Sequence, residues 1–171
     1  MIPYDLKKIK GMAFNVDGVL SSPMVTLSGE TPTRTANIKD GYALQLAVKR
    51  GFQVAIITGG RCVYVRQRYE GLGVQDIYMG QSIKIKTLTE WMEKHGLKPS
   101  EVLYMGDDIP DYQAMKAVGC SCCPQDATEE IKNIATYISP ICGGLGCVRD
   151  VVRQVMLAQD CWMSDDTAFG W

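Results

Sequence analysis

The sequence predicts an α/β fold in which a doubly wound parallel sheet carries helices on both faces. Short apolar segments alternate along almost the whole chain with segments whose apolar residues have helical spacing. The apolar segments are continuous, which is typical of strands buried on both faces of a sheet. Four of them stop at small or polar residues, near positions 15–17, 58–59, 80 and 106–108. Since the carboxyl ends of parallel strands meet at one edge, we expect these residues to form a site there.

Composition and charge limit the classes of function. The 171 residues are enough for one domain with a substantial core, and no linker or repeat divides residues 1–171. Eighteen basic and 19 acidic side chains argue against a nucleic-acid or membrane-surface partner. The first residues lack the apolar core of a signal peptide, and no apolar run approaches transmembrane length. We therefore expect a soluble, cytoplasmic protein.

The first predicted strand covers residues 11–16 and ends in two polar residues, Asn15 and Asp17. Alternate residues of a strand point the same way, so these two side chains should share one direction. Two extended runs follow, at 24–27 and 33–37, and residues 28–32 between them contain Gly and Pro. We predict a small β-hairpin insertion over about 21–37 that projects from the end of the first strand.

Helical and extended patterns then alternate to the end of the chain. In order, we predict a helix over 40–48, a strand over 54–57, a helix over 62–70, a strand over 76–79, a helix over 83–94, a strand over 102–105, a helix over 111–118, a strand over 120–123, a helix over 128–135, a strand over 137–138 and a helix over 148–158. The tail, about 159–171, is aromatic and acidic, which favours docking over full solvation.

Seven cysteines, an odd number, favour free thiols in the absence of a secretory signal. Cys120, Cys122 and Cys123 with Cys142 and Cys147 could form a zinc site, but their spacing matches no usual paired pattern, and the sequence has one histidine. Buried small apolar residues are the favoured interpretation.

Asp17, Asp107, Asp108 and Asp111 would repel one another if they gathered at one edge. A hard cation relieves that repulsion, and an all-oxygen site with few carboxylates suits Mg²⁺. The sequence therefore predicts a magnesium site.

Thr58 and the backbone amides of Gly59 and Gly60, at a strand-to-helix turn, suit a phosphate, and Lys84 could balance its charge. Each of these motifs, taken singly, is also common in ordinary turns and on solvated helices. Their placement at successive strand ends favours phosphoryl transfer.

These motifs resemble a known superfamily. Residues 14–20, 56–60, 80–84 and 106–111 are similar to the four motifs of the haloacid dehalogenase superfamily. The hairpin with residues 37–42 and 143–150 resembles the 3-deoxy-D-manno-octulosonate 8-phosphate (Kdo 8-phosphate) phosphatase family, over roughly residues 7–157. The resemblance implies a Rossmann-like fold without a cap domain.

The resemblance also implies roles for the residues at these positions. The family's aspartate nucleophile, which forms an aspartyl-phosphate, corresponds to Asn15. Asp17 would protonate the leaving alcohol and then activate water, while Thr58, Gly59 and Lys84 would bind the phosphoryl oxygens.

By the same resemblance, Mg²⁺ would be held by Asp107, the side chain at position 15 and the backbone oxygen of Asp17. Asp108 and Asp111 would orient Lys84 and the metal shell.

The resemblance implies a sugar-acid phosphate as substrate and a homotetramer in which hairpins and tails help to close neighbouring sites. Arg61, after the phosphate loop, is a candidate for the carboxylate of the sugar acid, although a surface position at a helix start is an equal alternative.

Asn15 allows three interpretations, because its amide can ligate Mg²⁺ but is a very poor nucleophile. The chain could be an engineered variant of an active phosphatase, a natural silent relative that binds a sugar phosphate, or an enzyme in which water attacks directly with help from Asp17. Retention of every other group favours the first.

We therefore predict an Mg²⁺-dependent phosphatase scaffold for Kdo 8-phosphate, a precursor in lipopolysaccharide synthesis, impaired at Asn15. The alternatives are a phosphatase for a nine-carbon sugar-acid 9-phosphate and a silent phosphosugar-binding or scaffold protein.

Overall fold

The computed structural model describes residues 1–27 and 30–170, and six of their strands form one sheet in the order β3-β2-β1-β4-β5-β6. The strands are β1 (Gly11–Phe14), β2 (Gln53–Ile57), β3 (Asp76–Tyr78), β4 (Val102–Met105), β5 (Cys120–Cys123) and β6 (Tyr137–Ile138). Every neighbouring pair is parallel, so the predicted α/β class with a parallel sheet is confirmed.

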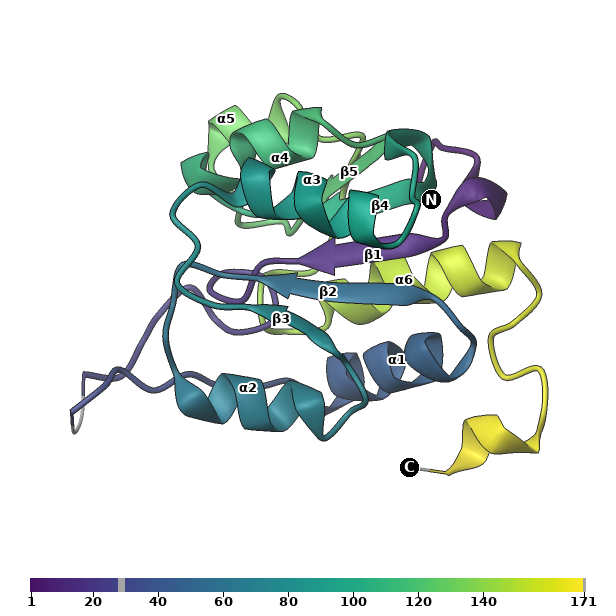
Figure 1. Cartoon of the computed structure of the whole chain (residues 1–171), viewed down its shortest axis with the longest axis horizontal. Coiled ribbons are helices and arrows are strands. Elements are labelled where there is room, and N and C mark those ends of the chain that lie inside the picture. The colour runs from purple at the N-terminus through teal and green to yellow at the C-terminus, as the bar shows by residue number, and fades with distance from the viewer. Residues whose placement is uncertain (28–29, 171) are drawn as a thin grey trace.

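Helices cover both faces of the sheet (Figure 1). One face packs against α1 (Ile38–Lys49), α2 (Val63–Glu70) and α6 (Cys147–Ala158), and the other against α3 (Lys84–Lys94), α4 (Tyr112–Lys116) and α5 (Glu129–Lys132). Each face has its own apolar cluster, with Phe14 and Leu44 in the first and Trp91 in the second. Among the described residues, no helix combines the length and apolar composition needed to cross a membrane.

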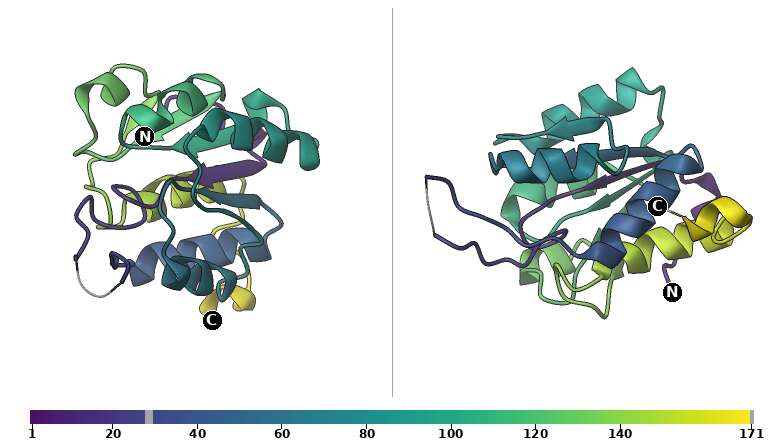
Figure 2. Two further views of the ribbon diagram at one scale, coloured as in Figure 1. Left: turned by 60° about the vertical axis from the view of Figure 1, so that its left-hand side comes forward. Right: turned by 90° about the horizontal axis from the view of Figure 1, so that it is seen from below.

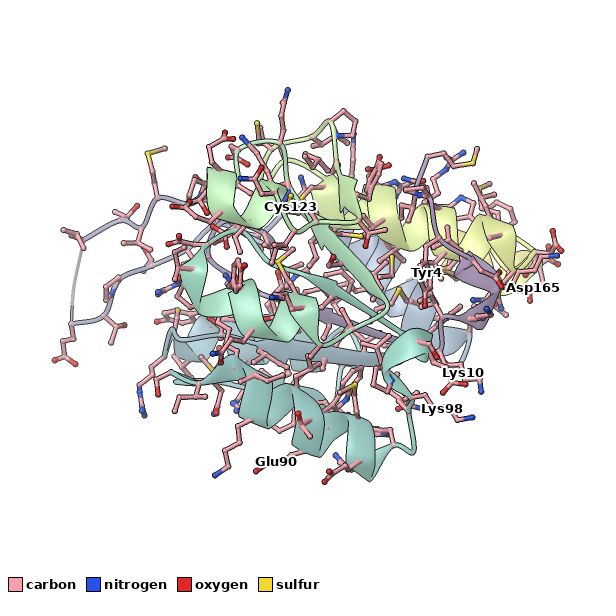
Figure 3. All side chains as sticks on the ribbon, turned by 90° about the horizontal axis from the view of Figure 1, so that it is seen from above. Tyr4, Lys10, Glu90, Lys98, Cys123 and Asp165 are labelled. Carbon is pink, nitrogen blue, oxygen red and sulfur yellow. The ribbon has the colours of Figure 1, made fainter. Side chains whose placement is uncertain are left out.

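The strands direct their carboxyl ends toward the side from which residues 21–27 and 30–37 project (Figure 1). In Figure 3, Cys123 marks that end of β5, whereas Lys10 and Lys98 lie at the opposite end. The predicted gathering of four strand ends on one side of the sheet is therefore present.

Several predicted boundaries shift by a few residues. The first strand ends at Phe14 instead of 16, although the Asn15 N–H still donates to the Met105 carbonyl at 3.0 Å. The helix predicted over 111–118 begins as a 3₁₀ turn, Ile109–Asp111, and the helix proper ends at Lys116. Three further short 3₁₀ turns were not predicted, at Leu6–Lys8, Pro99–Glu101 and Asp166–Phe169. Such single turns have no periodic signature.

The hairpin is less regular than predicted. Two arms project from the sheet (Figure 2), but the described residues pair only at Thr26 and Thr33, whose backbone groups exchange hydrogen bonds of 3.1 Å. The extended runs predicted at 24–27 and 33–37 are therefore joined by a single antiparallel bridge instead of a regular ladder. Asn37, at the end of the second run, instead caps α1 by accepting the Lys39 N–H at 2.9 Å. Residues 28 and 29 of the predicted connection lie outside the described residues.

The tail docks on the chain's own helices, beside α1 and α6 (Figure 2). The Trp162 ring meets the edge of Tyr42 at a centroid distance of 6.2 Å, and the Arg149 guanidinium lies 5.1 Å from the Trp162 centroid. The Tyr42 hydroxyl donates to the Ala168 carbonyl. Trp171 lies outside the described residues.

Five of the seven cysteines are buried and all seven are free. Cys120, Cys122 and Cys123 belong to the central layer of the fold, because they form β5 with Ser121. The favoured interpretation, small apolar residues of the core, is confirmed for these three.

Asp40, in the first turn of α1, caps the neighbouring helix α6. Its Oδ1 accepts the backbone N–H of Arg149, in the first turn of α6, at 2.7 Å. The N-cap residue of α6 is Gly146, which has no side chain to accept a hydrogen bond from that turn. Within the described part of the chain, the buried Oδ2 atom has no partner. Burial raises the pKa of the Asp40 carboxyl from 3.8 to about 6, although the Arg149 N–H and charge oppose this.

We expect Asp40→Asn to change how stability depends on pH. The raised pKa of Asp40 means that the ionised carboxylate destabilises the folded state, so stability is lost as pH rises from about 4 through 6. Asparagine keeps an acceptor for Arg149 without the charge. In urea titrations, the variant should match the parent at pH 4 and exceed its free energy of unfolding by about 3 kcal/mol at pH 7. A constant difference across that range would contradict this account.

Candidate active site

A cavity of about 700 Å³ lies at the carboxyl ends of the strands. Its lining combines the ends of β1 to β4 with the hairpin, and includes the predicted residues Asn15, Asp17, Thr58, Gly59, Lys84, Asp107, Asp108 and Asp111, together with Pro23, Arg34, Gly60, Gln81, Ser82 and Pro110. The structure thus brings together eight predicted site residues from four separate segments of the chain.

A buried ion pair stands in the wall of this cavity. Lys84, the first residue of α3, is 4% exposed, and its Nζ lies 2.7 Å from Oδ1 of Asp111, which is fully buried. The same oxygen accepts the Tyr104 hydroxyl at 2.7 Å, and Oδ2 accepts the Asp107 backbone N–H at 3.1 Å. Asp111 therefore holds both the lysine and the loop after β4 in place.

Thr58 closes the end of β2 and connects it to the loop after β3. Its backbone N–H donates to the Tyr78 carbonyl and its carbonyl accepts the Gln81 N–H, both at 2.9 Å. The Thr58 Oγ1 accepts the Gly60 N–H at 3.1 Å, which folds the turn tightly. A buried hydroxyl and a buried ammonium, that of Lys84, therefore face one cavity, an arrangement suited to an anion such as phosphate.

Three oxygen atoms converge on the side-chain nitrogen of Asn15. Nδ2 donates to the Asp17 carbonyl at 2.8 Å and to Oδ1 of Asp107 at 2.9 Å, and Oδ2 of Asp111 lies at 3.4 Å. Gly18 is left-handed (φ 79°), and a Cβ there would overlap the Asp107 carboxylate, so glycine permits this close approach. The amide N–H groups thus fill a position where a cation would also find oxygen ligands.

The electrostatics of Asp107 fit a cation at that position. Burial raises the pKa of Asp107 to about 7, and the Asp111 charge adds to this, while the Asn15 amide and the Lys84 charge oppose it. A bound cation would supply the missing opposite charge. The described residues contain no group of three or more His, Cys, Asp or Glu side chains placed to hold a metal, so a cation here would need other oxygen ligands as well. One carboxylate with an amide and a backbone carbonyl suits Mg²⁺, which keeps several waters.

Two predicted residues are placed differently from the role expected of them. Asp108 is exposed, and its Oδ1 caps the 3₁₀ turn by accepting the Ile109 N–H at 2.8 Å. Of these two aspartates, Asp111 is the one paired with Lys84. Arg61 is exposed, packs its guanidinium against Gly80 and does not line the cavity.

Arg34, from the second arm of the hairpin, is a cavity residue that the sequence did not predict. Its Nε and Nη2 lie 2.6 and 3.0 Å from the two carboxylate oxygens of Asp17, and its side chain is 11% exposed. The only signal in the sequence was a lone arginine in a predicted hairpin, which does not reveal that the arm folds back over the strand ends.

Comparison with known proteins identifies the family of this chain. A haloacid dehalogenase-like hydrolase family matches residues 73–141, the part that contains Lys84, Asp107 and Asp111. The chain is 36% identical over 154 residues to the 3-deoxy-D-manno-octulosonate 8-phosphate phosphatase of Escherichia coli (strain K12), covering 90% of this chain and 82% of that one.

Solved structures give the same result. The 3-deoxy-D-manno-octulosonate 8-phosphate phosphatase of Yersinia pestis superposes with a TM-score of 0.88 at 33% identity, over 91% of this chain and 85% of that one. The enzyme of Moraxella catarrhalis, solved with a magnesium ion, a phosphate ion and a KDO molecule, has a TM-score of 0.91 at 32% identity, over 97% and 96%. This chain therefore belongs to the 3-deoxy-D-manno-octulosonate 8-phosphate phosphatase family of haloacid dehalogenase-like hydrolases.

Proposed function

We propose that the cavity binds Kdo 8-phosphate and is built for Mg²⁺-dependent release of its phosphate. The observation that carries the proposal is the convergence of Lys84, Thr58, Asp17 and Asp107 in one cavity of a chain from this phosphatase family. Anion-binding groups lie beside oxygen ligands for a cation, which is the combination that phosphoryl transfer requires.

In this proposal the phosphoryl oxygens bind the Thr58 hydroxyl, the Gly59 backbone and the Lys84 ammonium. Asp17 delivers a proton to the alcohol that leaves and later takes one from the attacking water. The side chain of Asn15, the Asp107 carboxylate and the Asp17 carbonyl would hold Mg²⁺, which neutralises negative charge on the phosphoryl group.

Asn15 determines how far this chemistry proceeds. A neutral amide cannot form the covalent intermediate that the family's aspartate forms, so we propose that the chain binds its substrate and turns it over slowly at most. The intact surroundings of Asn15 support an otherwise working site, in agreement with an asparagine variant of an active phosphatase. A silent phosphosugar-binding protein and a phosphatase for a nine-carbon sugar-acid phosphate remain the alternatives.

Calorimetric titration with Kdo 8-phosphate in the presence of Mg²⁺ tests the proposed binding. We expect one site per chain and weaker binding for the Lys84→Met variant, because that variant lacks the ammonium facing the phosphate. Tighter binding of the nine-carbon sugar-acid 9-phosphate would favour that alternative, and binding of neither ester would refute the proposal.

Affinity for Mg²⁺ should follow the charge of the converging oxygen atoms. We expect Asp107→Asn to weaken Mg²⁺ at least about 10-fold and Asn15→Asp to strengthen it by a similar factor, since these changes remove and add an anionic ligand. Calorimetry or equilibrium dialysis measures both. Asp108→Asn is the matched control, because Asp108 caps a turn and contributes no atom to the convergence on Asn15. An equal loss in the Asp108 variant would contradict the assigned ligand set.

We also propose that residues 1–171 act as one domain and assemble as a homotetramer in the cytoplasm. Met24 and Leu27, on the first hairpin arm, are 77% and 85% exposed, which supports a contact with another copy. The tail lies on its own α1 and α6, so the hairpin is the better candidate to reach a neighbour.

Light scattering after size-exclusion chromatography should therefore give the mass of a tetramer. The double variant Met24→Ser/Leu27→Ser should shift it to smaller species, because it removes apolar contacts. A monomeric parent would exclude this assembly.

A further inference from the structure

Arg34 is held firmly at the mouth of the cavity. Its Nε and Nη2 bind the two oxygens of Asp17, and its Nη1 donates to the Pro32 carbonyl at 2.9 Å. The Asp17 hydrogen bond raises the pKa of Arg34, against the opposing effect of burial, so the side chain remains a cation. The side chain belongs to the lining of the cavity and is 11% exposed.

Gly60 provides the space that the guanidinium occupies. A Cβ at position 60 would lie 2.9 Å from Nη2 and 3.3 Å from Cζ of Arg34, closer than side chains normally pack. The Gly60 N–H is bound by the Thr58 hydroxyl, so Arg34 lies against the proposed phosphate loop as well as on Asp17. The arginine therefore connects the proposed acid–base residue to the place where the phosphate would bind.

Arg34 and Lys84 are the cationic side chains among the described residues that line the cavity. Lys84 is paired with Asp111 and faces the phosphate in the proposed function, whereas Arg34 stands at Asp17, where the leaving alcohol would be protonated. A guanidinium has five N–H groups, and Asp17 and Pro32 accept three of them. The two terminal nitrogens carry one further N–H each, and the Cys62 side chain forms a hydrogen bond with the guanidinium. The remaining N–H, together with the positive charge, can form a charge-assisted hydrogen bond to a carboxylate.

We propose that Arg34 is a specificity-determining residue that binds a carboxylate on the leaving group, so that the site selects phosphate esters of acid sugars over those of neutral sugars. This inference rests on the proposed function, because it names the part of that substrate which Arg34 meets. Arg61, the other candidate, is exposed and lies outside the lining.

Binding calorimetry on the unmodified chain with Mg²⁺ tests the proposal. The two probes are Kdo 8-phosphate and the same ester with its carboxylate reduced to a primary alcohol. The unmodified chain should prefer the acid by roughly 10- to 100-fold, the range expected of a charge-assisted pair. Arg34→Gln should abolish that preference and leave the affinity for the alcohol within about threefold. Arg34→Lys should retain only part of it, since an ammonium lacks the planar fork.

Two further variants separate Arg34 from its surroundings. Gly60→Ala should lower the preference as Arg34→Gln does, because the added methyl group displaces the guanidinium. Arg153→Gln, an exposed change on α6, is the control and should leave the preference unchanged.

The outcomes distinguish this inference from the proposed function. If Arg34→Gln weakens both esters equally, Arg34 acts only through Asp17 and the inference is wrong, while the proposed function stands. Loss of the preference in Arg61→Gln instead of Arg34→Gln would also overturn it. If the unmodified chain binds neither ester, the proposed function fails and the inference fails with it.

Discussion

Asn15→Asp is expected to raise the rate of phosphate release from Kdo 8-phosphate by roughly 10⁴- to 10⁶-fold, the range over which loss of a nucleophile or of its partners lowers kcat in other enzymes. The change replaces one side-chain nitrogen by an oxygen at a position already 2.9 Å from Asp107 and 2.8 Å from the Asp17 carbonyl. An aspartate there would repel both oxygens in the absence of a cation. The gain should therefore require Mg²⁺ and disappear with a chelator.

Steady-state phosphate release measures this gain. Two controls locate the chemistry: Asn15→Ala should stay inactive because it lacks an attacking group, and Asn15→Asp/Asp17→Asn should lose most of the gain because it lacks the proton donor. Mass spectrometry of the Asn15→Asp protein quenched during turnover should show a phosphoryl adduct on residue 15. Rapid turnover by the Asn15 chain itself would instead establish direct attack by water, and no turnover by the aspartate variant would remove the phosphatase assignment.

Lys84→Met should have the largest effect on stability, lowering the free energy of unfolding by about 3–5 kcal/mol, the usual cost of leaving a buried charge without its partner. Asp111 is fully buried, and its only cationic partner within the described residues is Lys84, at 2.7 Å. The Tyr104 hydroxyl and the Asp107 N–H would remain as donors, but neither carries a compensating charge.

Urea unfolding without Mg²⁺ measures the loss. The matched control is the double variant Lys84→Met/Asp111→Asn, which removes both charges and keeps an acceptor for Tyr104. It should recover a substantial part of the stability, since the remaining buried groups are neutral. A loss below about 1 kcal/mol for Lys84→Met, or no recovery in the double variant, would show that the pair is not responsible for holding this wall of the cavity.

Local sequence patterns were enough to predict most of the fold. Continuous apolar runs such as 54–57 and 102–105 predict buried parallel strands. A strand that is buried on both faces of the sheet has apolar side chains at successive positions and shows no alternation of apolar and polar residues. Parallel strands place their carboxyl ends at one edge of the sheet, so the predicted strand ends also indicated which side chains would meet there. These are Asn15, Thr58, Lys84, Asp107 and Asp111.

Contacts between remote segments were not predictable in this way. The Asn15 amide points at Asp107, 92 residues away, Arg34 folds back onto Asp17, and Trp162 packs on Tyr42. The direction of a hairpin arm or a tail depends on which side chains pack beneath it, and no periodicity along the chain encodes that choice. The sequence by itself therefore determined the sheet and the set of groups at its edge. Only the tertiary structure decided which atoms face one another there, because burial and charge pairing in three dimensions select among conformations that are locally equivalent.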